Sequence, residues 1–459
     1  MINIDFSDKN THFHFIGIGG ISMSGLAEML LADGFKVSGS DMTESELTDS
    51  LTSLGADIAF PQSADNINDD IDYVIYTAAI HEDNPELMEV RRRNIPALTR
   101  ASFLGQVMKR YRVSVAVAGT HGKTTTTSML SEILIKADTD PTISVGGMLK
   151  SIGGNFRVGS RDFFVTEACE YTNSFLSFFP TIGVILNVDE DHLDFFKDLR
   201  DIQESFHKFA ALIPEDGALI INGATRGIDI ITEGLKCPII TFGEESSFDY
   251  YPSDISLDDM ACATFTLHRG DTVLGRVSLK IPGEHNVGNA CAAAAVAEEM
   301  GIAPEQIIKG LGEFGGTDRR FQYKGSFNGV KVVDDYAHHP TEIKATLNAA
   351  KKCSYNTLWC VFQPHTFTRT KALLPEFAEA LSLADKIVLA DIYPARETDN
   401  LGISSETLAD ELKARGNNVY YFNSFEKIEK FLSENCIHGD LLITMGAGDV
   451  YKIGDNILK

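Results

Sequence analysis

The residues best placed to do chemistry form a short glycine-rich run after an apolar stretch. Glycines let backbone N–H groups approach phosphate oxygens, and the start of a following helix adds positive potential. A lysine in such a loop reaches the terminal phosphates of a nucleotide, and the next hydroxyl faces Mg²⁺. The run follows the predicted strand Val113 to Ala118 and predicts an ATP-binding loop made of Gly119, Thr120, His121, Gly122, Lys123, Thr124 and Thr125.

The spacing of this loop departs from the common phosphate-loop pattern. Only two residues separate Gly119 from Gly122, and Val117 stands where the first glycine of the common pattern would lie. An ordinary turn between a strand and a helix is the alternative interpretation. We prefer the phosphate loop, because Gly-Lys-Thr-Thr follows the strand directly.

Acidic residues follow two further predicted strands, Phe163 to Thr166 and Ile182 to Leu186. Glu167 ends the first strand, and the run Asn187 to His192 follows the second. Parallel strands place their carboxyl ends on one edge of a sheet, so these groups should lie beside the phosphate loop. We therefore predict a metal site made of Thr124, Glu167 and His192, although imidazole is an unusual ligand for Mg²⁺. For the remaining acidic residues we prefer a solvated turn: Asp189, Glu190, Asp191 and Asp194.

A third polar loop, Gly283 to Ala290, precedes the Ala-rich helix predicted over Ala290 to Glu299. Its Asn286 and Asn289 have side chains that can hydrogen-bond a nucleotide base or a phosphate. The alternative is an ordinary helix cap, in which asparagine is a favoured residue.

A second glycine loop lies near the N-terminus, after the strand predicted over His12 to Ile18. Gly17-Ile18-Gly19-Gly20-Ile21-Ser22 resembles a dinucleotide-binding fingerprint with Ser22 in place of its third glycine, and Asp41 lies about twenty residues on. The loop indicates a nucleotide diphosphate at a helix N-terminus without specifying NAD. An NAD-dependent dehydrogenase is therefore a rival from another enzyme class, although it would leave Lys123 and Glu167 without a role.

These loops have to be positioned by an α/β fold. Short apolar runs alternate with helical patterns, which is typical of parallel α/β layers. The 459 residues suggest three domains at about 150 residues each. We place them at residues 1–108, 109–321 and 322–459.

Composition excludes several classes of partner. The 40 basic and 65 acidic residues give a net charge of -25, which disfavours nucleic acid and anionic lipid. No apolar run is long enough to span a membrane, and the first ten residues lack a signal-peptide core. The seven cysteines include no Cys-x-x-Cys pair, so we expect neither disulfides nor a zinc knuckle. This cysteine content fits a reducing compartment, and we therefore expect a cytoplasmic location.

Motifs from all three predicted units resemble those of the Mur ligase family of peptidoglycan precursor synthesis, over nearly the whole chain. The shortened phosphate loop is the form that this family uses. The motifs that carry the resemblance are Gly17 to Gly25, Gly119 to Thr126, Gly283 to Ala290, Arg319-Arg320-Phe321, Asp334 to Glu342 and Gln363 to His365.

The resemblance implies three α/β domains with separate tasks. It implies an N-terminal Rossmann-like domain for a UDP-sugar, a central P-loop-type ATPase domain with a parallel sheet, and a C-terminal Rossmann-like domain that closes over both with an amino acid. The implied contacts to the UDP-sugar are Gly19, Gly20, Ser22, Met23, Asp41, Thr77 and Asn155. Beyond the phosphate loop, the implied contacts to ATP are made by Asn286, Asn289, Arg320 and Asp335. Arg320 would reach the γ-phosphate, and Asp335 would hold the ribose or a neighbouring loop.

The resemblance also implies an activity, in which ATP and Mg²⁺ activate the lactyl carboxylate of UDP-N-acetylmuramate as an acyl phosphate that L-alanine then attacks. The implied amino-acid pocket is Tyr336, His338, His365 and Arg369; ordinary core or capping roles are the alternative for each histidine. The implied catalytic residues are Lys123, Arg320, His192 and His338. The sequence decides neither the general base nor the preference among alanine, glycine and serine.

Other readings remain open at this point. A related ligase that attaches a preformed peptide during wall recycling is one, and a non-catalytic nucleotide-sensing module is another. The sequence departs from many relatives in two places. Cys169 and Tyr171 stand where relatives often have an acidic or small polar run that bears on secondary metal contacts. Thr366 stands where a basic residue is often found beside His365, which bears on how the amino-acid carboxylate is held. Lys208 is not assigned the role of the modified lysine that several relatives use. A monomer or a homodimer is expected.

Overall fold

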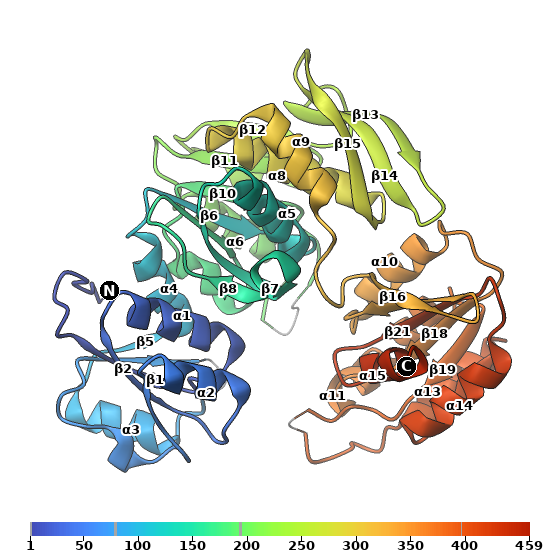
Figure 1. The fold of residues 1–459 in the computed structure, drawn as a ribbon, viewed down its shortest axis with the longest axis horizontal. Helices are drawn as coiled ribbons and strands as arrows, with labels where there is room; N and C mark the ends of the chain where they lie inside the picture. The colour runs from blue at the N-terminus through green and yellow to red at the C-terminus, as the bar shows by residue number, and fades with distance from the viewer. Residues whose placement is uncertain (1, 78–79, 192–194, 396) are drawn as a thin grey trace. The chain divides into compact units, whose positions relative to one another are not determined.

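The computed structural model describes residues 2–77, 80–191, 195–395 and 397–459, and His192 lies outside them. The described residues form three sheets (Figure 1). It divides into two compact units, each described by itself: residues 1–253, 266–277 and 288–314, and residues 254–265, 278–287 and 315–459. Within the described residues no helix is long and apolar enough to cross a membrane.

The first sheet is wholly parallel, with the strand order β3-β2-β1-β4-β5. Its central strand is buried along its whole length, as expected for a parallel strand covered on both faces. The order reverses between β1 and β4, which is where open α/β sheets bind ligands. The strands are β1 (His12–Ile16), β2 (Lys36–Ser40), β3 (Asp57–Ala59), β4 (Tyr73–Tyr76) and β5 (Ala97–Thr99); the helices are α1 (Ile21–Ala32), α2 (Glu46–Ser53), η1 (Ala64–Asn66), α3 (Pro85–Arg93) and α4 (Arg100–Met108).

The second sheet has ten strands in the order β15-β14-β13-β12-β11-β10-β6-β9-β7-β8. The strands β12, β11, β10, β6, β9 and β7 are parallel, and β8 runs antiparallel to β7. The strands are β6 (Val113–Ala118), β7 (Thr142–Leu149), β8 (Gly154–Arg157), β9 (Phe163–Glu167), β10 (Ile182–Ile185), β11 (Ala218–Asn222), β12 (Ile239–Phe242), β13 (Tyr250–Leu257), β14 (Cys262–Arg269) and β15 (Thr272–Pro282). The helices are α5 (Lys123–Lys136), η2 (Lys150–Ile152), η3 (Tyr171–Ser177), α6 (Leu199–Ala210), α7 (Ile228–Thr232), α8 (His285–Glu299) and α9 (Pro304–Glu313).

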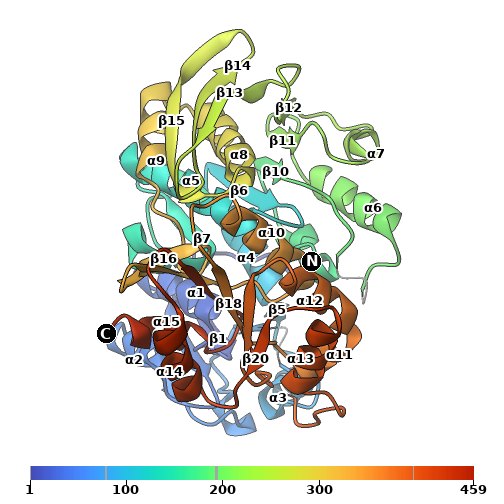
Figure 2. The same cartoon turned by 90° about the vertical axis from the view of Figure 1, so that its right-hand side faces the viewer.

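The third sheet has the order β16-β17-β21-β18-β19-β20, with only the β16–β17 pair antiparallel. Helices α10, α12 and α13 pack on one face and α14 and α15 on the other, each with its own apolar cluster (Figure 2). The strands are β16 (Gln322–Phe327), β17 (Val330–Asp335), β18 (Leu358–Phe362), β19 (Lys386–Leu389), β20 (Val419–Tyr421) and β21 (Leu441–Met445). The helices are α10 (Pro340–Ala350), α11 (Phe367–Ala372), α12 (Leu374–Leu381), α13 (Ser405–Ala414), α14 (Phe425–Asn435) and α15 (Tyr451–Ile457).

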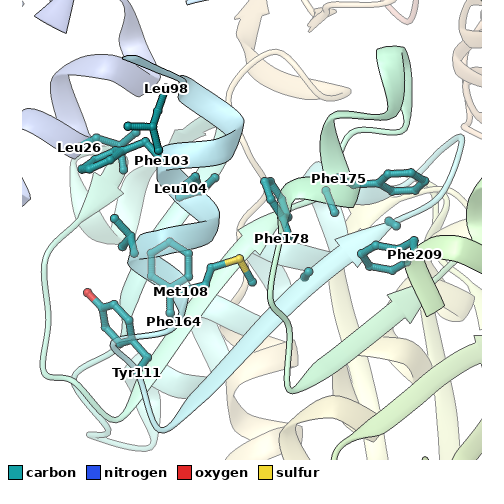
Figure 3. Packing of buried hydrophobic residues seen from close by; sticks show 14 of the residues in the cluster. Leu26, Leu98, Phe103, Leu104, Met108, Tyr111, Phe164, Phe175, Phe178 and Phe209 are labelled. Carbon is teal, nitrogen blue, oxygen red and sulfur yellow. The ribbon is translucent and has the colours of Figure 1, made fainter. Parts of the chain in front are cut away.

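The first two sheets share one apolar core. Phe103 and Met108 of α4 belong to the same buried cluster as Phe164 of β9 and Phe175 of η3 (Figure 3). Burying each such side chain contributes about 1.5–3 kcal/mol. A Cβ at Gly105 would lie 1.9 Å from the Ser177 carbonyl oxygen, so only glycine lets α4 approach η3 this closely. The two sheets are therefore packed into one unit.

Two expected boundaries differ from the structure by two residues or more. The strand predicted over His12 to Ile18 ends at Ile16, because Gly17 has a φ of 82° and begins the turn. The Ala-rich helix begins at His285 and not at Ala290, so Asn286 and Asn289 lie in its first turns and not in a preceding loop.

Candidate active site

The predicted phosphate loop joins β6 to α5, as its sequence requires. Gly119 and Gly122 have φ values of 140° and 86°, which side chains rarely adopt. A Cβ on Gly119 would lie 2.9 Å from the Leu186 Cβ, and one on Gly122 would lie 2.6 Å from the Asn289 Oδ1. Both glycines are therefore required by backbone conformation and by space, and Asn289 lies against the loop.

The Lys123 ammonium is held over the loop by groups of the protein. Its Nζ lies 3.0 Å from the Oε2 of the buried Glu170, and it donates to the carbonyl oxygens of Gly119 at 2.5 Å and Thr120 at 3.2 Å. Sequence reasoning gave Glu170 no role, although Glu170 follows Glu167 by three residues. The lysine is positioned and its charge is balanced by one carboxylate.

Two of the predicted metal ligands lie side by side. The Thr124 hydroxyl donates to Glu167 Oε2 at 3.0 Å, and the Gly146 N–H donates to the other carboxylate oxygen. A hydroxyl and a carboxylate suit Mg²⁺, which takes few protein oxygens and completes its shell with phosphates and water. His192, the third predicted ligand, lies outside the described residues, which contain no group of three or more His, Cys, Asp or Glu side chains placed for a metal.

Asn187, which follows β10, fixes the shape of the phosphate loop. Its Oδ1 accepts from the His121 N–H at 2.7 Å, and its Nδ2 donates to the His121 carbonyl at 3.0 Å. Its own carbonyl accepts from the Thr120 N–H at 3.2 Å. Sequence reasoning gave Asn187 no role. The available signal was an amide directly after the strand that neighbours β6. Asp189 and Glu190 beyond it are exposed, as the solvated turn predicts.

Asn286 has a local role at the start of α8. This buried side chain donates through Nδ2 to the Pro282 carbonyl at 2.8 Å. The bond ties the helix start to the end of β15. A nucleotide contact by Asn286 stays a prediction.

The N-terminal glycine loop lies at the switch point of the first sheet. Asp41 accepts from the Gly19 N–H at 2.8 Å and from the Met42 N–H at 2.7 Å, so its carboxylate holds the loop. A Cβ on Gly17 would lie 3.2 Å from the Thr77 Cγ2, which places Thr77 beside the loop. Gly20 precedes α1, whose first turn contains the half-buried Ser22 and the buried Met23.

Asn155 lies in β8, which packs directly on α1. A Cβ on Gly25 of α1 would lie 2.3 Å from the ring of Phe156, the residue after Asn155. The middle sheet therefore brings Asn155 to the helix that follows the glycine loop, in keeping with its predicted place at the UDP-sugar.

In the second unit, Asp335 organises the Arg319–Phe321 turn. The buried carboxylate accepts from the Phe321 N–H at 2.7 Å and from the Ala337 N–H at 2.8 Å. Arg319 and Phe321 have positive φ values of 60° and 47°, so this turn is strained for residues that carry side chains. Of the two predicted roles of Asp335, holding a neighbouring loop is the one that these bonds fill.

The two adjacent arginines of this turn differ in their surroundings. Arg319 donates through Nε to the buried Asp334 at 3.1 Å and also bonds the Gly446 carbonyl. Arg320 is exposed, with its guanidinium carbon 5.7 Å from the centre of the Tyr336 ring. Arg319 is thus structural, and Arg320 is available to a ligand, as its predicted role requires.

The four residues of the predicted amino-acid pocket are brought together. The ring centres of Tyr336 and His338 lie 5.4 Å apart, and those of His338 and His365 lie 5.8 Å apart. The Arg369 guanidinium lies 3.5 Å from His365 Nδ1. Thr366, between them, has a φ of 68° and accepts from the Arg369 N–H at 3.4 Å. Tyr336 and His338 lie between β17 and α10, whereas His365 and Arg369 lie in the segment from the end of β18 into α11, so two neighbouring loops of the third sheet bring the four residues together.

Burial sets the protonation of this cluster. It lowers the pKa of His338, whose neighbours Arg369 and Arg320 act in the same direction while Glu342 opposes them. Burial also lowers the pKa of His365, aided by His338 and Arg369. Both imidazoles are therefore neutral near pH 7. His338 Nδ1 donates to the Tyr336 carbonyl at 3.1 Å, which leaves its Nε2 as the proton acceptor.

Comparison with known proteins identifies the class to which this fold and site belong. The model of the Mur ligase family catalytic domain matches residues 12–112, that of the Mur ligase middle domain matches 117–297, and that of the glutamate ligase domain matches 319–448. The chain belongs to the Mur ligase family. The family predicted from the motifs is thereby confirmed, and the N-terminal glycine loop lies in a Mur ligase domain rather than a dehydrogenase.

Individual relatives cover the whole chain. The chain is 58% identical over 459 residues to UDP-N-acetylmuramate–L-alanine ligase of Agathobacter rectalis, with both chains covered in full. The solved UDP-N-acetylmuramate–alanine ligase of Thermotoga maritima is 30% identical, with a TM-score of 0.80 over 98% of each chain. The solved murein peptide ligase of Psychrobacter arcticus is 26% identical, with a TM-score of 0.70 over 98% of each chain. The predicted three-domain α/β fold is confirmed.

Proposed function

We propose that the protein is an ATP-dependent ligase that joins L-alanine to the lactyl carboxylate of UDP-N-acetylmuramate in peptidoglycan precursor synthesis. One observation carries the proposal. A phosphate loop holds Lys123 against Glu170 and Thr124 against Glu167, in a chain 58% identical to a ligase of that name. A nicotinamide-dependent dehydrogenase would give these four groups no task.

The reaction has two steps. A lactyl carboxylate oxygen bonds to the γ-phosphorus of ATP as the bond to the β,γ-bridging oxygen breaks, which yields an acyl phosphate and ADP. Lys123 and Arg320 stabilise the charge that spreads over the transferred phosphoryl group. The neutral amine of alanine then attacks the acyl carbon, phosphate leaves, and the nitrogen loses a proton as the amide forms.

Mg²⁺ is the metal that we assign to the phosphate loop. Thr124 and Glu167 would hold it, and His192 stays a predicted third ligand. When bound, the ion neutralises phosphate charge beside Lys123. The oxygen atoms of the first two residues lie 3.0 Å apart, which is close enough for both to face one ion.

We assign the amino acid to the cluster in the second unit. Arg369 can grip a carboxylate with two parallel hydrogen bonds. His338, with Nδ1 bound to the Tyr336 carbonyl, presents Nε2 as an acceptor for the amine proton. His365 stands between these two groups and completes the pocket.

A ligase that adds a preformed peptide to the same UDP-sugar is the second candidate. It is favoured by the likeness to a murein peptide ligase at a TM-score of 0.70. The first candidate is favoured by the 58% identity to an L-alanine ligase over the full chain. We therefore rank the L-alanine ligase first.

A coupled ADP-release assay tests the proposal and separates it from its rivals. The purified protein receives ATP, Mg²⁺ and UDP-N-acetylmuramate together with alanine, glycine, serine or a tripeptide. We expect fastest release with alanine. Preference for the tripeptide would select the recycling ligase, and the absence of release with every acceptor would reject ligase function. A nucleotide-sensing module would bind ATP without this strict dependence on both substrates.

We also propose a cytoplasmic location, as a monomer or homodimer. All seven cysteines are free thiols, which suits a reducing compartment. The substrates proposed here, ATP and a UDP-linked sugar, are cytoplasmic metabolites. Fractionation of cells with an antibody to the protein would test the location, and light scattering would test the assembly.

A further inference from the structure

We propose that Arg100 binds the carboxylate of the UDP-sugar, at the place where the first sheet's last helix meets the phosphate-loop segment. This inference rests on the proposed function and deepens it. Arg100 is the first residue of α4, which follows β5 of the first sheet. No motif singled it out, and the mechanism above does not use it.

The backbone fixes the position of Arg100. Helix α4 packs on η3 so closely that a Cβ at Gly105 would lie 1.9 Å from the Ser177 carbonyl oxygen. Leu104 and Met108 of α4 lie near Phe178 of the same segment (Figure 3). The segment 168–170 directly precedes η3, and the Phe175 N–H donates to the Cys169 carbonyl at 3.1 Å. These contacts hold α4 against η3, the segment that directly follows residues 168–170.

The electrostatic neighbours of Arg100 connect it to the phosphate loop. Its guanidinium interacts with the Cys169 thiol, and that thiol interacts in turn with Glu170 and Lys123. Arg100 therefore lies near the Cys169–Glu170 segment, whose Glu170 pairs with Lys123 of the phosphate loop at 3.0 Å.

The charge of Arg100 has no protein counterpart among the residues that the structure describes. Burial is the main cause that lowers the pKa of its guanidinium, and no hydrogen bond or ion pair of this group is found in the described part of the chain. Glu170 is taken by Lys123 at 3.0 Å. A half-buried arginine without an anion is costly, and it also lies at the positive end of α4.

An anionic ligand would recover that cost. The proposed substrate has two anionic parts, a diphosphate and a lactyl carboxylate. The diphosphate is assigned to the glycine loop at Gly19 and Gly20, at the switch point of the first sheet. The carboxylate has to reach the phosphate loop to attack ATP, and Arg100 lies beside that loop. We therefore assign the guanidinium to the carboxylate and, after the first step, to the acyl phosphate.

Two sugar nucleotides distinguish these two anionic parts. UDP-N-acetylmuramate carries both, whereas UDP-N-acetylglucosamine has the same nucleotide and amino sugar without the lactyl group. Binding of each to the wild type, Arg100→Ala, Arg100→Gln and Arg100→Lys is measured by calorimetry, and turnover by ADP release. Arg112→Ala is the matched control, because Arg112 is an exposed arginine of the same unit, paired with exposed Asp162 at 3.1 Å.

For Arg100→Ala we expect UDP-N-acetylmuramate to bind about 10-fold to 100-fold more weakly, the usual range for a lost charge-assisted contact. UDP-N-acetylglucosamine binding and the KM for ATP should change less than about twofold, and Arg100→Lys should keep part of the affinity. Should Arg100→Ala fail to fold, Arg100→Gln against Arg100→Lys makes the same comparison.

Two results would overturn the inference. Equal weakening of both sugar nucleotides would move Arg100 to the diphosphate or to a structural role. Unchanged binding of both would remove it from the site. Failure of the proposed function looks different, since the wild type itself would then release no ADP with UDP-N-acetylmuramate and alanine.

Discussion

The phosphate loop and the His338–Arg369 cluster balance their charges in opposite ways. At the loop, Lys123 is paired with Glu170, and Glu167 accepts from Thr124 and from a backbone N–H. At the cluster, Arg369 faces His365, and both imidazoles are kept neutral by burial. Two carboxylates lie near them and accept from backbone N–H groups. Glu342 accepts from the His338 and His339 N–H groups at 3.0 and 3.3 Å, and Glu397 accepts from the Thr368 N–H at 3.1 Å.

This difference indicates two modes of binding. The loop is a cradle whose shape and charges are set before a nucleotide arrives, which is the arrangement that electrostatic catalysis requires. At the cluster, Arg369 forms no ion pair with any residue that the structure describes, which suits capture of a carboxylate. Substitutions at the loop should therefore act mainly on turnover, and substitutions at the cluster mainly on amino-acid affinity.

The strongest test of this comparison is Lys123→Ala. Loss of the ammonium removes charge stabilisation from the transferred phosphoryl group, so we expect kcat to fall by about 10³-fold or more with the fold intact. ADP release measures the rate, and circular dichroism checks the fold. Lys136→Ala, on the same helix and paired with Glu313 at 2.7 Å, is the control and should keep wild-type rates. Normal turnover in Lys123→Ala would remove the loop from the mechanism.

The next test concerns the shape of the cradle. Asn187→Ala deletes both side-chain bonds to His121, at 2.7 and 3.0 Å, without removing a charge. We expect kcat/KM for ATP to fall about 10-fold to 100-fold, since each such bond contributes about 0.5–1.5 kcal/mol and its loss misplaces the loop. The KM for alanine should stay within about twofold. If alanine were affected as strongly as ATP, the loop and the cluster could not be treated as separate devices.

At the cluster, Arg369→Ala should have the reverse signature. Removing the guanidinium takes away the carboxylate anchor, so we expect the KM for alanine to rise about 10-fold to 100-fold. The KM for ATP should be nearly unchanged. Initial rates over a grid of both substrates separate the two effects. Lys371→Ala, an exposed cation two residues on, should leave both constants unaltered. An unaltered alanine dependence in Arg369→Ala would move the amino-acid pocket elsewhere.

How far each region could be predicted from sequence differs for a physical reason. Lys123 and Thr124 were predicted because glycine, lysine and hydroxyl spacing after a strand has a local cause. Glu170, the partner of Lys123, and Asn187, the partner of His121, were missed as such, because the members of these pairs are 47 and 66 residues apart in the sequence. Only the order of strands in the sheet brings them together. The residues of the His338–Arg369 cluster were predicted from the resemblance to the family and not from their spacing in the sequence.

The fold shows the same division between local and non-local causes. The apolar run Val113–Ala118 was predicted at its observed bounds, since parallel strands buried on both faces leave continuous hydrophobic stretches. The antiparallel strands β13 to β15 were not predicted. Along β14, buried apolar residues alternate with partly exposed, mostly polar ones. Whether such a segment forms a strand depends more on its neighbours in the sheet than on its own composition.

The smallest expected effect is on the pH dependence of folding around His338. Its pKa in the folded protein lies below the ordinary 6.5, so the unfolded chain binds more protons as the pH falls below 6.5. The free energy of unfolding should therefore fall with pH between 6.5 and the lowered pKa. Asp335 acts in the opposite direction, because burial raises the pKa of its carboxyl to about 6 and the folded form then binds the extra proton.

Comparing the wild type with His338→Gln isolates the contribution of His338 to the pH dependence of stability, since Asp335 contributes equally to both proteins. Trp359 is the only tryptophan in the sequence and is fully buried in β18, so its fluorescence during urea unfolding reports on the third sheet. From pH 7 to 5.5, His338→Gln should lose less stability than the wild type, while exposed His438→Gln should follow the wild type. Parallel curves for all three proteins would mean that His338 is not held neutral by burial, and the contrast between cluster and loop would lose its electrostatic basis.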